Sequence, residues 1–114
     1  MSKYMFLFRG GMMAEMSPEQ LQTNMMRWKN WMEELAAKGR MVGGEPLADA
    51  GKVLRGKDKK ISDGPFAEGK ELVGGYLIVN ASSMDEAVEL SKGCPIFERE
   101  QGSLEVRQVM EAAM

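Results

Sequence analysis

The order in which strand-like runs and helix signals follow one another is the sequence feature that most constrains the fold. Two segments carry clear helix starts, and a short apolar or alternating run lies on either side of each. Runs of this length are typical of strands in a sheet. A chain with this pattern packs its helices against a sheet, so a mixed class of helix and strand is expected.

The first predicted helix begins at the sequence SPEQ, residues 17–20. Ser17 is a good cap residue, the proline after it fits the first turn, and Gln20 completes a capping box. Gly39 supplies the stop. Trp31 lies off the central apolar stripe, so we expect it at an exposed interface. The stripe itself has spacings of three and four and predicts a buried face formed by Leu21, Met25, Trp28, Met32 and Leu35.

A second helix is predicted from Ser83, which is followed three residues later by Glu86 in another capping box. Gly93 ends this helix. The apolar residues near its start predict an inward side formed by Met84, Ala87 and Val88.

The strand-like segments complete the topology. Residues 72–80, LVGGYLIVN, are continuously apolar, which suggests a central strand covered on both faces. Residues 53–55 and 60–61 are expected to pair as a hairpin across the turn at 56–58. With the runs at 3–9, 41–47 and 103–109, the order is strand, helix, strand, hairpin, strand, helix, strand. This predicts a single α+β domain over residues 1–114, with a ferredoxin-like split βαβ arrangement and an added hairpin.

Composition narrows the functional classes. The chain of 114 residues has a net charge of −2, which argues against a nucleic-acid binder. It has no histidine and one cysteine, Cys94, so we expect no metal site, no cofactor and no internal disulfide. No apolar run is long enough to span a membrane, and a cytoplasmic protein is expected. Two helices on one face of a sheet leave the other face open, which favours a homodimer.

Longer motifs cover nearly the whole chain. They are KYMFLF from residue 3, SPEQLQ from 17, GGEPL from 43, SDGPFAEGKELVGGYLIV from 62, DEAVELSKGCP from 85 and GSLEVR from 102. In this order they resemble the YCII-related family and, within it, the group named for the DGPF motif. The resemblance implies a dimeric α/β-barrel type of fold with a cleft between sheet and helix.

The same resemblance implies no settled activity, although the wider family was proposed to use a histidine–aspartate pair. Asp63 of the DGPF motif matches the acid. Aligned from Ser17, the position of the histidine is Asn24. Asparagine donates and accepts hydrogen bonds but does not shuttle protons. Either Asp63 acts alone as a catalytic acid or base in a cleft, or the chain only binds a small organic ligand.

Three further residues are candidates for ligand contact. Asn24 is a candidate to orient a ligand, Tyr76 offers a hydroxyl on an apolar body, and Glu45 follows two glycines that allow close approach. Each also has a plain structural explanation, as does Asp63, because Asp-Gly is a common turn. A rival hypothesis is a non-catalytic interaction protein that assists a sigma factor in transcription initiation. It rests on the missing histidine and on the expected exposure of Trp31.

Overall fold

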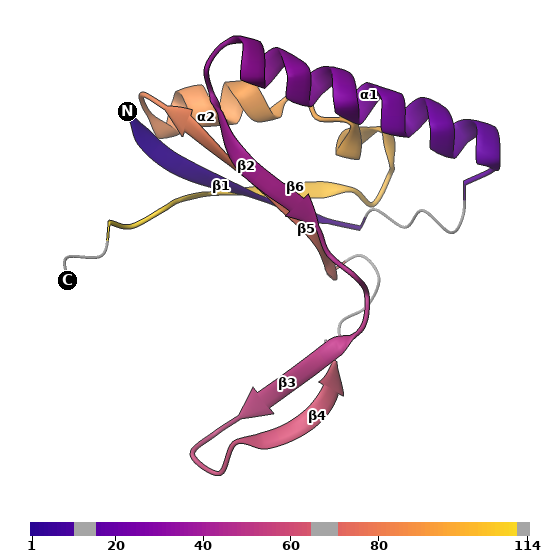
Figure 1. The fold of residues 1–114 in the computed structure, drawn as a ribbon, viewed down its shortest axis with the longest axis vertical. Coiled ribbons are helices and arrows are strands. Elements are labelled where there is room, and N and C mark those ends of the chain that lie inside the picture. The colour runs from indigo at the N-terminus through magenta and orange to yellow at the C-terminus, as the bar shows by residue number, and fades with distance from the viewer. Residues whose placement is uncertain (11–15, 65–70, 112–114) are drawn as a thin grey trace.

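A computed structural model describes residues 1–10, 16–64 and 71–111 of the chain. Its main body is a four-stranded antiparallel sheet in the order β2-β5-β1-β6, with two helices on one face (Figure 1). The predicted α+β, ferredoxin-like arrangement is confirmed. The elements of this body are β1 (Ser2–Arg9), α1 (Pro18–Ala37), β2 (Met41–Pro46), β5 (Val73–Ala81), α2 (Met84–Ser91), the 3-10 helix η2 (Pro95–Glu98) and β6 (Ser103–Gln108).

The core lies between the sheet and the helices. In β1 every second residue is buried, because alternate side chains of a strand point to opposite faces. The same alternation holds in β5, so only one face of this strand is well covered. The expected central position of residues 72–80 is confirmed, since β5 lies between β2 and β1, but within the described part of one chain only one face of this strand is covered. The buried core consists of Tyr4, Phe6, Phe8, Trp31, Leu35, Leu77, Val79, Ala81, Ala87, Cys94 and Ile96.

Helix α1 has the predicted ends, and most of its predicted inner face is confirmed: Leu35 is buried, and Leu21, Trp28 and Met32 are half-buried. Ser17 and Gln20 form the capping box, and Gly39 has a φ of 71°. Trp31 is 5% exposed, so its expected exposure is wrong, whereas Met25 is 56% exposed. The fully buried row consists of Asn24, Trp31 and Leu35, so it shares Leu35 with the predicted stripe and otherwise lies one residue away from it. It starts at Asn24, a polar residue, so the apolar periodicity pointed to the neighbouring row.

The inner side expected for helix α2 is confirmed only for Ala87. Ala87 and Ser91 are buried, while Met84 and Val88 are 41% and 37% exposed. Ala87 and Ser91 are four residues apart and therefore lie on one face of the helix. Their small side chains allow α2 to lie close to the sheet. The prediction for Met84 and Val88 was wrong because it placed large apolar side chains on the inner side of the helix.

The predicted hairpin is present as a separate two-stranded sheet of β3 (Gly51–Arg55) and β4 (Lys60–Gly64). Leu54 pairs with Ile61, and Gly56 in the turn has a φ of 72°. The hairpin projects away from the body, beyond the ends of β2 and β5 (Figure 1).

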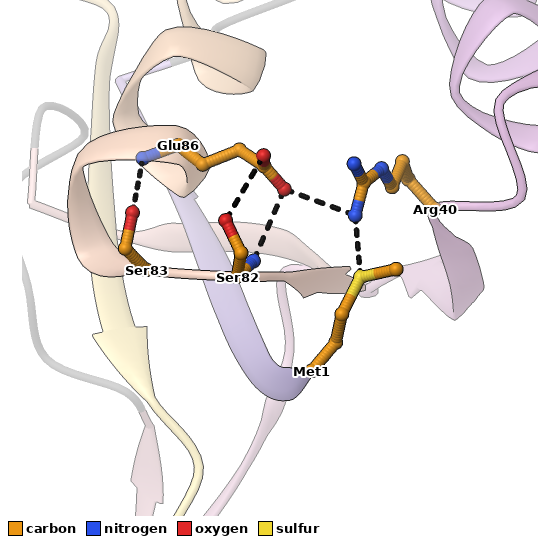
Figure 2. Close-up of polar contacts among 5 residues, drawn as sticks. All are labelled: Met1, Arg40, Ser82, Ser83 and Glu86. Atoms are coloured by element: carbon orange, nitrogen blue, oxygen red, sulfur yellow. Dashed lines mark hydrogen bonds and ion pairs between the residues drawn. The ribbon is translucent and has the colours of Figure 1, made fainter.

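A polar network joins the loop after α1 to the start of α2 (Figure 2). Arg40 lies 2.9 Å from a carboxylate oxygen of Glu86. The same carboxylate accepts hydrogen bonds from the backbone N–H and the hydroxyl of Ser82, both at 3.1 Å. Arg40 also contacts the sulfur of Met1. The pKa of Glu86 is lowered, chiefly by the Ser82 N–H; partial desolvation opposes this, and the Ser82 hydroxyl and Arg40 reinforce it.

Glu86→Gln is expected to reduce the loss of unfolding free energy that the protein shows as the pH is lowered. A carboxyl group with a lowered pKa in the folded state stabilises above its unfolded pKa, and this contribution is lost as pH falls through the folded pKa. Urea unfolding at about pH 6 and about pH 3 should show a larger loss for the parent than for the variant. Glu89→Gln is the control, because Glu89 is exposed and pairs with Lys92 on the surface. An equal pH dependence in the parent and Glu86→Gln would contradict the prediction.

Candidate binding site

A cavity of about 350 Å³ lies between α1 and one end of the sheet. Its size is within the range of small-molecule sites, roughly 300–1,000 Å³. Helix α1 forms one side, the strands β1, β2 and β5 form the other, and η2 with the residue after it closes the end. The lining residues are Phe8, Asn24, Met25, Trp28, Lys29, Trp31, Met32, Gly44, Glu45, Pro46, Gly74, Gly75, Tyr76, Leu77, Pro95, Ile96 and Arg99.

One wall of the cavity is aromatic. Trp28 packs edge-on against Phe8 with ring centroids 4.9 Å apart, and against Trp31 with centroids 5.8 Å apart. Edge-to-face packing of this kind restrains the rings against one another. The wall is therefore preformed, and it offers apolar faces and ring edges to a ligand.

On the opposite wall of the cavity, two glycines leave the surface of the sheet without side chains. Gly44 pairs with Leu77, and Gly75 is buried beside it in the sheet. A Cβ atom at Gly44 would lie 2.4 Å from the carbonyl oxygen of Tyr76. The strands β2 and β5 therefore require glycine at this point, and the missing side chain leaves a flat surface where a planar molecule fits.

Asn24 is the buried polar side chain of this site. It is 4% exposed, and its amide nitrogen has no hydrogen-bond partner. An unpaired buried donor costs about 1–3 kcal/mol. Since Asn24 lines the cavity, an oxygen acceptor bound there is the group that would satisfy it.

Positive charge borders the same space. Arg99 and Lys29 both line the cavity. The Lys29 side chain is 75% exposed, so it lies at the rim. These cations favour an electron-rich or anionic oxygen near Asn24.

Asp63 is not where the sequence suggested. Its side chain is 79% exposed, and it forms an ion pair with Lys52 across the hairpin. It does not belong to the cavity wall. The expectation that Asp63 lies in a hollow between the first helix and the sheet is therefore wrong within one chain. The turn signal that Asp-Gly gives is local and carries no information about the distance to α1.

Glu45 and Tyr76 border the cavity, but the pleat turns their side chains away. Tyr76 is flanked in β5 by the buried Gly75 and Leu77, so its phenol ring lies on the opposite face of the sheet. Glu45 is paired with Tyr76 and shares that face. A ligand in the cavity would meet their main chain. Of the three predicted contact residues, only Asn24 comes from the helix side.

Cys94 is a packing residue of the core. It is buried, and desolvation raises the pKa of its thiol to about 12. Its sulfur accepts a hydrogen bond from the backbone N–H of Ile96 at 3.5 Å. The thiol stays protonated near neutral pH and is not a nucleophile.

Two further searches cover the described ranges 1–10, 16–64 and 71–111. Within them, no three cysteine or acidic side chains come together in a way that would hold a metal ion. Over the same ranges, neither helix combines the length and the apolar character required to cross a membrane.

Sequence reasoning missed part of the site. Trp28 was predicted on the buried face of the first helix, Phe8 only as part of a strand, and Arg99 and Ile96 carried no signal. A short 3-10 helix brings Ile96 and Arg99 to the cavity. Only the tertiary fold places this segment beside α1, so periodicity could not reveal it.

Comparisons with known proteins bear on the family and the fold. The family model described as the YCII-related domain matches residues 3–113. No curated protein matches the sequence significantly. Among solved structures, the chain is similar to a 5-chloro-2-hydroxyhydroquinone dehydrochlorinase from Burkholderia phenoliruptrix AC1100 in complex with 2,5-dihydroxybenzoquinone. The identity is 17%, the TM-score is 0.51, and the match covers 96% of this chain and 95% of that one.

Proposed function

The chain belongs to the YCII-related family, and we propose that it binds a small planar organic molecule in the cavity between α1 and the sheet. The observation that carries the proposal is the buried amide nitrogen of Asn24, which has no partner in a cavity with apolar walls. Native proteins pair nearly all buried polar groups, so an unpaired one in a ligand-sized space indicates a missing acceptor.

The walls define the chemical class of the ligand. The aromatic ring of Trp28 and the glycine surface at Gly44 and Gly75 suit a flat ring. The Asn24 amide and the nearby Arg99 suit a carbonyl, phenolate or carboxylate oxygen on that ring. We infer that the ligand is an oxygenated aromatic or quinone-like compound with one oxygen directed toward α1.

The structural relative supports this class without fixing it. The dehydrochlorinase was solved with 2,5-dihydroxybenzoquinone, a planar ring that carries hydroxyl and carbonyl oxygens. At 17% identity the likeness shows the fold. The same scaffold can therefore hold such a ring, and that compound is a suitable first probe.

Catalysis by Asp63 stays a prediction. Within one chain its carboxylate is held by Lys52 on the exposed hairpin. We also propose, from the motif that contains Asp63, that the chain belongs to the DGPF group. The function that the cavity supports is ligand binding. The rival hypothesis of an accessory to a sigma factor loses one of its two premises, because Trp31 is buried in the core.

The test replaces Asn24 with leucine, an apolar side chain of similar size. If the amide is a binding group, Asn24→Leu should raise the free energy of unfolding by about 1 kcal/mol, because an unpaired buried donor is removed. It should also weaken binding of 2,5-dihydroxybenzoquinone by about tenfold, the equivalent of one hydrogen bond. Urea unfolding and isothermal titration calorimetry measure the two effects.

Asn30→Leu is the matched control. Asn30 lies on the exposed side of the same helix, so its replacement should change neither affinity nor stability by much. Lower stability with unchanged affinity in Asn24→Leu would show that Asn24 has only a structural role. No binding of the quinone, of benzoate or of benzamide by the parent protein would overturn the proposal itself.

A further inference from the structure

We propose that the cavity selects the anionic form of its aromatic ligand and that Arg99 is the residue that recognises the charge. This inference rests on the proposed function, because it concerns the same cavity, and it adds the charge that the ligand carries. It starts from the placement of Arg99 close to Asn24.

Arg99 is built into the end of the cavity that η2 closes. It follows η2 directly and lines the cavity. Its backbone N–H donates to the carbonyl oxygen of Ile96 at 3.3 Å, and its own carbonyl oxygen accepts from the N–H of Gly102 at 3.1 Å. The main chain that carries this guanidinium is therefore fixed on both sides.

An ion pair holds the same segment against α1. Arg27 lies 2.5 Å from a carboxylate oxygen of Glu98, the residue before Arg99. Arg27 also follows Asn24 by three residues, and side chains at this spacing are neighbours on a helix. The ion pair therefore brings the segment that carries Arg99 to the turn of α1 that carries Asn24. A carboxylate in the cavity has one oxygen for the Asn24 amide and one for the guanidinium.

The charged side chains of the wall favour an anion. Arg99 and Lys29 line the cavity, with Lys29 at the rim. Among the described residues of the wall, Glu45 is the one acid, and its side chain lies on the opposite face of the sheet. A negatively charged ligand therefore meets cations without meeting a carboxylate of these residues.

Burial makes the guanidinium a strong determinant of specificity. The Nη2 nitrogen of Arg99 is shielded from solvent, and charges interact more strongly where water is excluded. Arginine keeps its charge at ordinary pH, and its five N–H donors allow it to bind a ligand while it contacts other residues. A hydrogen bond from this group to an anionic oxygen is roughly twice as strong as a bond between neutral groups.

The experiment compares benzoate with benzamide, which are similar in shape and differ in charge, by isothermal titration calorimetry near neutral pH. The parent should bind benzoate at least about tenfold more tightly, the equivalent of one charge-assisted hydrogen bond. Arg99→Gln keeps a donor but has no charge, and it should reduce this preference to below about threefold. Arg99→Lys keeps the charge without the planar fork and should retain a preference for benzoate. The ratio of the two affinities within one variant does not depend on the fraction that is folded.

Arg107→Gln is the matched control. The Arg107 side chain is 69% exposed, and it pairs with Met5 on the sheet face away from the helices. Its replacement removes the same charge from the chain and should leave the preference for benzoate unchanged. An equal loss of preference in Arg107→Gln would overturn the role of Arg99.

Two further outcomes separate this inference from the proposed function. A parent that binds benzoate and benzamide equally, or an Arg99→Gln variant that keeps the full preference, would overturn the inference and leave the proposed function standing. Binding of neither compound, nor of 2,5-dihydroxybenzoquinone, would overturn the proposed function and the inference with it.

Discussion

Gly102→Ala is expected to lower the free energy of unfolding by about 3 kcal/mol, the upper end of the usual cost of overpacking and a large part of the roughly 5–15 kcal/mol that stabilises a typical domain. A Cβ atom at this position would lie 2.0 Å from the carbonyl oxygen of Ile96 and 3.0 Å from its carbonyl carbon. Both atoms belong to the backbone, so no change of rotamer relieves the clash. The connection between η2 and β6 must move instead.

The same substitution should also weaken ligand binding, because η2 and the residue after it form one end of the cavity. The N–H of Gly102 donates to the carbonyl oxygen of Arg99 at 3.1 Å, so a displaced Gly102 moves Arg99 with it. Urea unfolding measures the first effect, and calorimetry with 2,5-dihydroxybenzoquinone measures the second. Gly74→Ala is the control for stability, since a Cβ atom at Gly74 would meet nothing within 4 Å.

A stability of Gly102→Ala within about 0.5 kcal/mol of the parent, the range of an ordinary surface substitution, would contradict the close approach of the two backbones. Equal losses in Gly102→Ala and Gly74→Ala would show that any side chain on this end of the sheet is harmful, whatever lies next to it. The difference between the two variants therefore isolates the contact with Ile96.

The elements and their order were predictable because their signals are local. Ser17 and Gln20 bond to each other, and Ser83 accepts from the backbone N–H of Glu86, so these short motifs carry the helix starts. In β6, Leu104 and Val106 are half-buried and Glu105 between them is exposed, the alternation typical of a half-exposed strand. Such signals need no knowledge of the tertiary structure.

The faces of the helices and the position of the site were less predictable. The inner row of α1 includes Asn24, and a polar residue in such a row misleads any reading of apolar periodicity. Asp63 belongs to the most specific motif of the chain, but its side chain lies exposed on the hairpin. No local sequence signal indicates whether this side chain faces the body or the solvent. Asn24 was found by its alignment with a family histidine, while Arg99 reaches the cavity only through the tertiary fold.

Trp31 gives the second large prediction, because it connects the core to the site. Its ring stacks with Phe6 at a centroid distance of 6.2 Å, and its indole N–H donates to the carbonyl oxygen of Leu90 at 3.2 Å. It also lines the cavity and packs against Trp28. Trp31→Ala should therefore lower the free energy of unfolding by about 3–5 kcal/mol. It should also weaken quinone binding by the protein that remains folded.

Trp31→Phe separates packing from hydrogen bonding. Phenylalanine keeps an aromatic ring beside Phe6 but leaves the carbonyl oxygen of Leu90 without its donor, so the expected loss is about 1–3 kcal/mol. Urea unfolding followed by far-ultraviolet circular dichroism measures both variants without depending on tryptophan emission. If Trp31→Ala lowered the free energy of unfolding by less than about 0.5 kcal/mol, as surface replacements do, Trp31 would be exposed. In that case the aromatic wall, which depends on Trp31 to hold Trp28 in place, would not be preformed for a planar ligand.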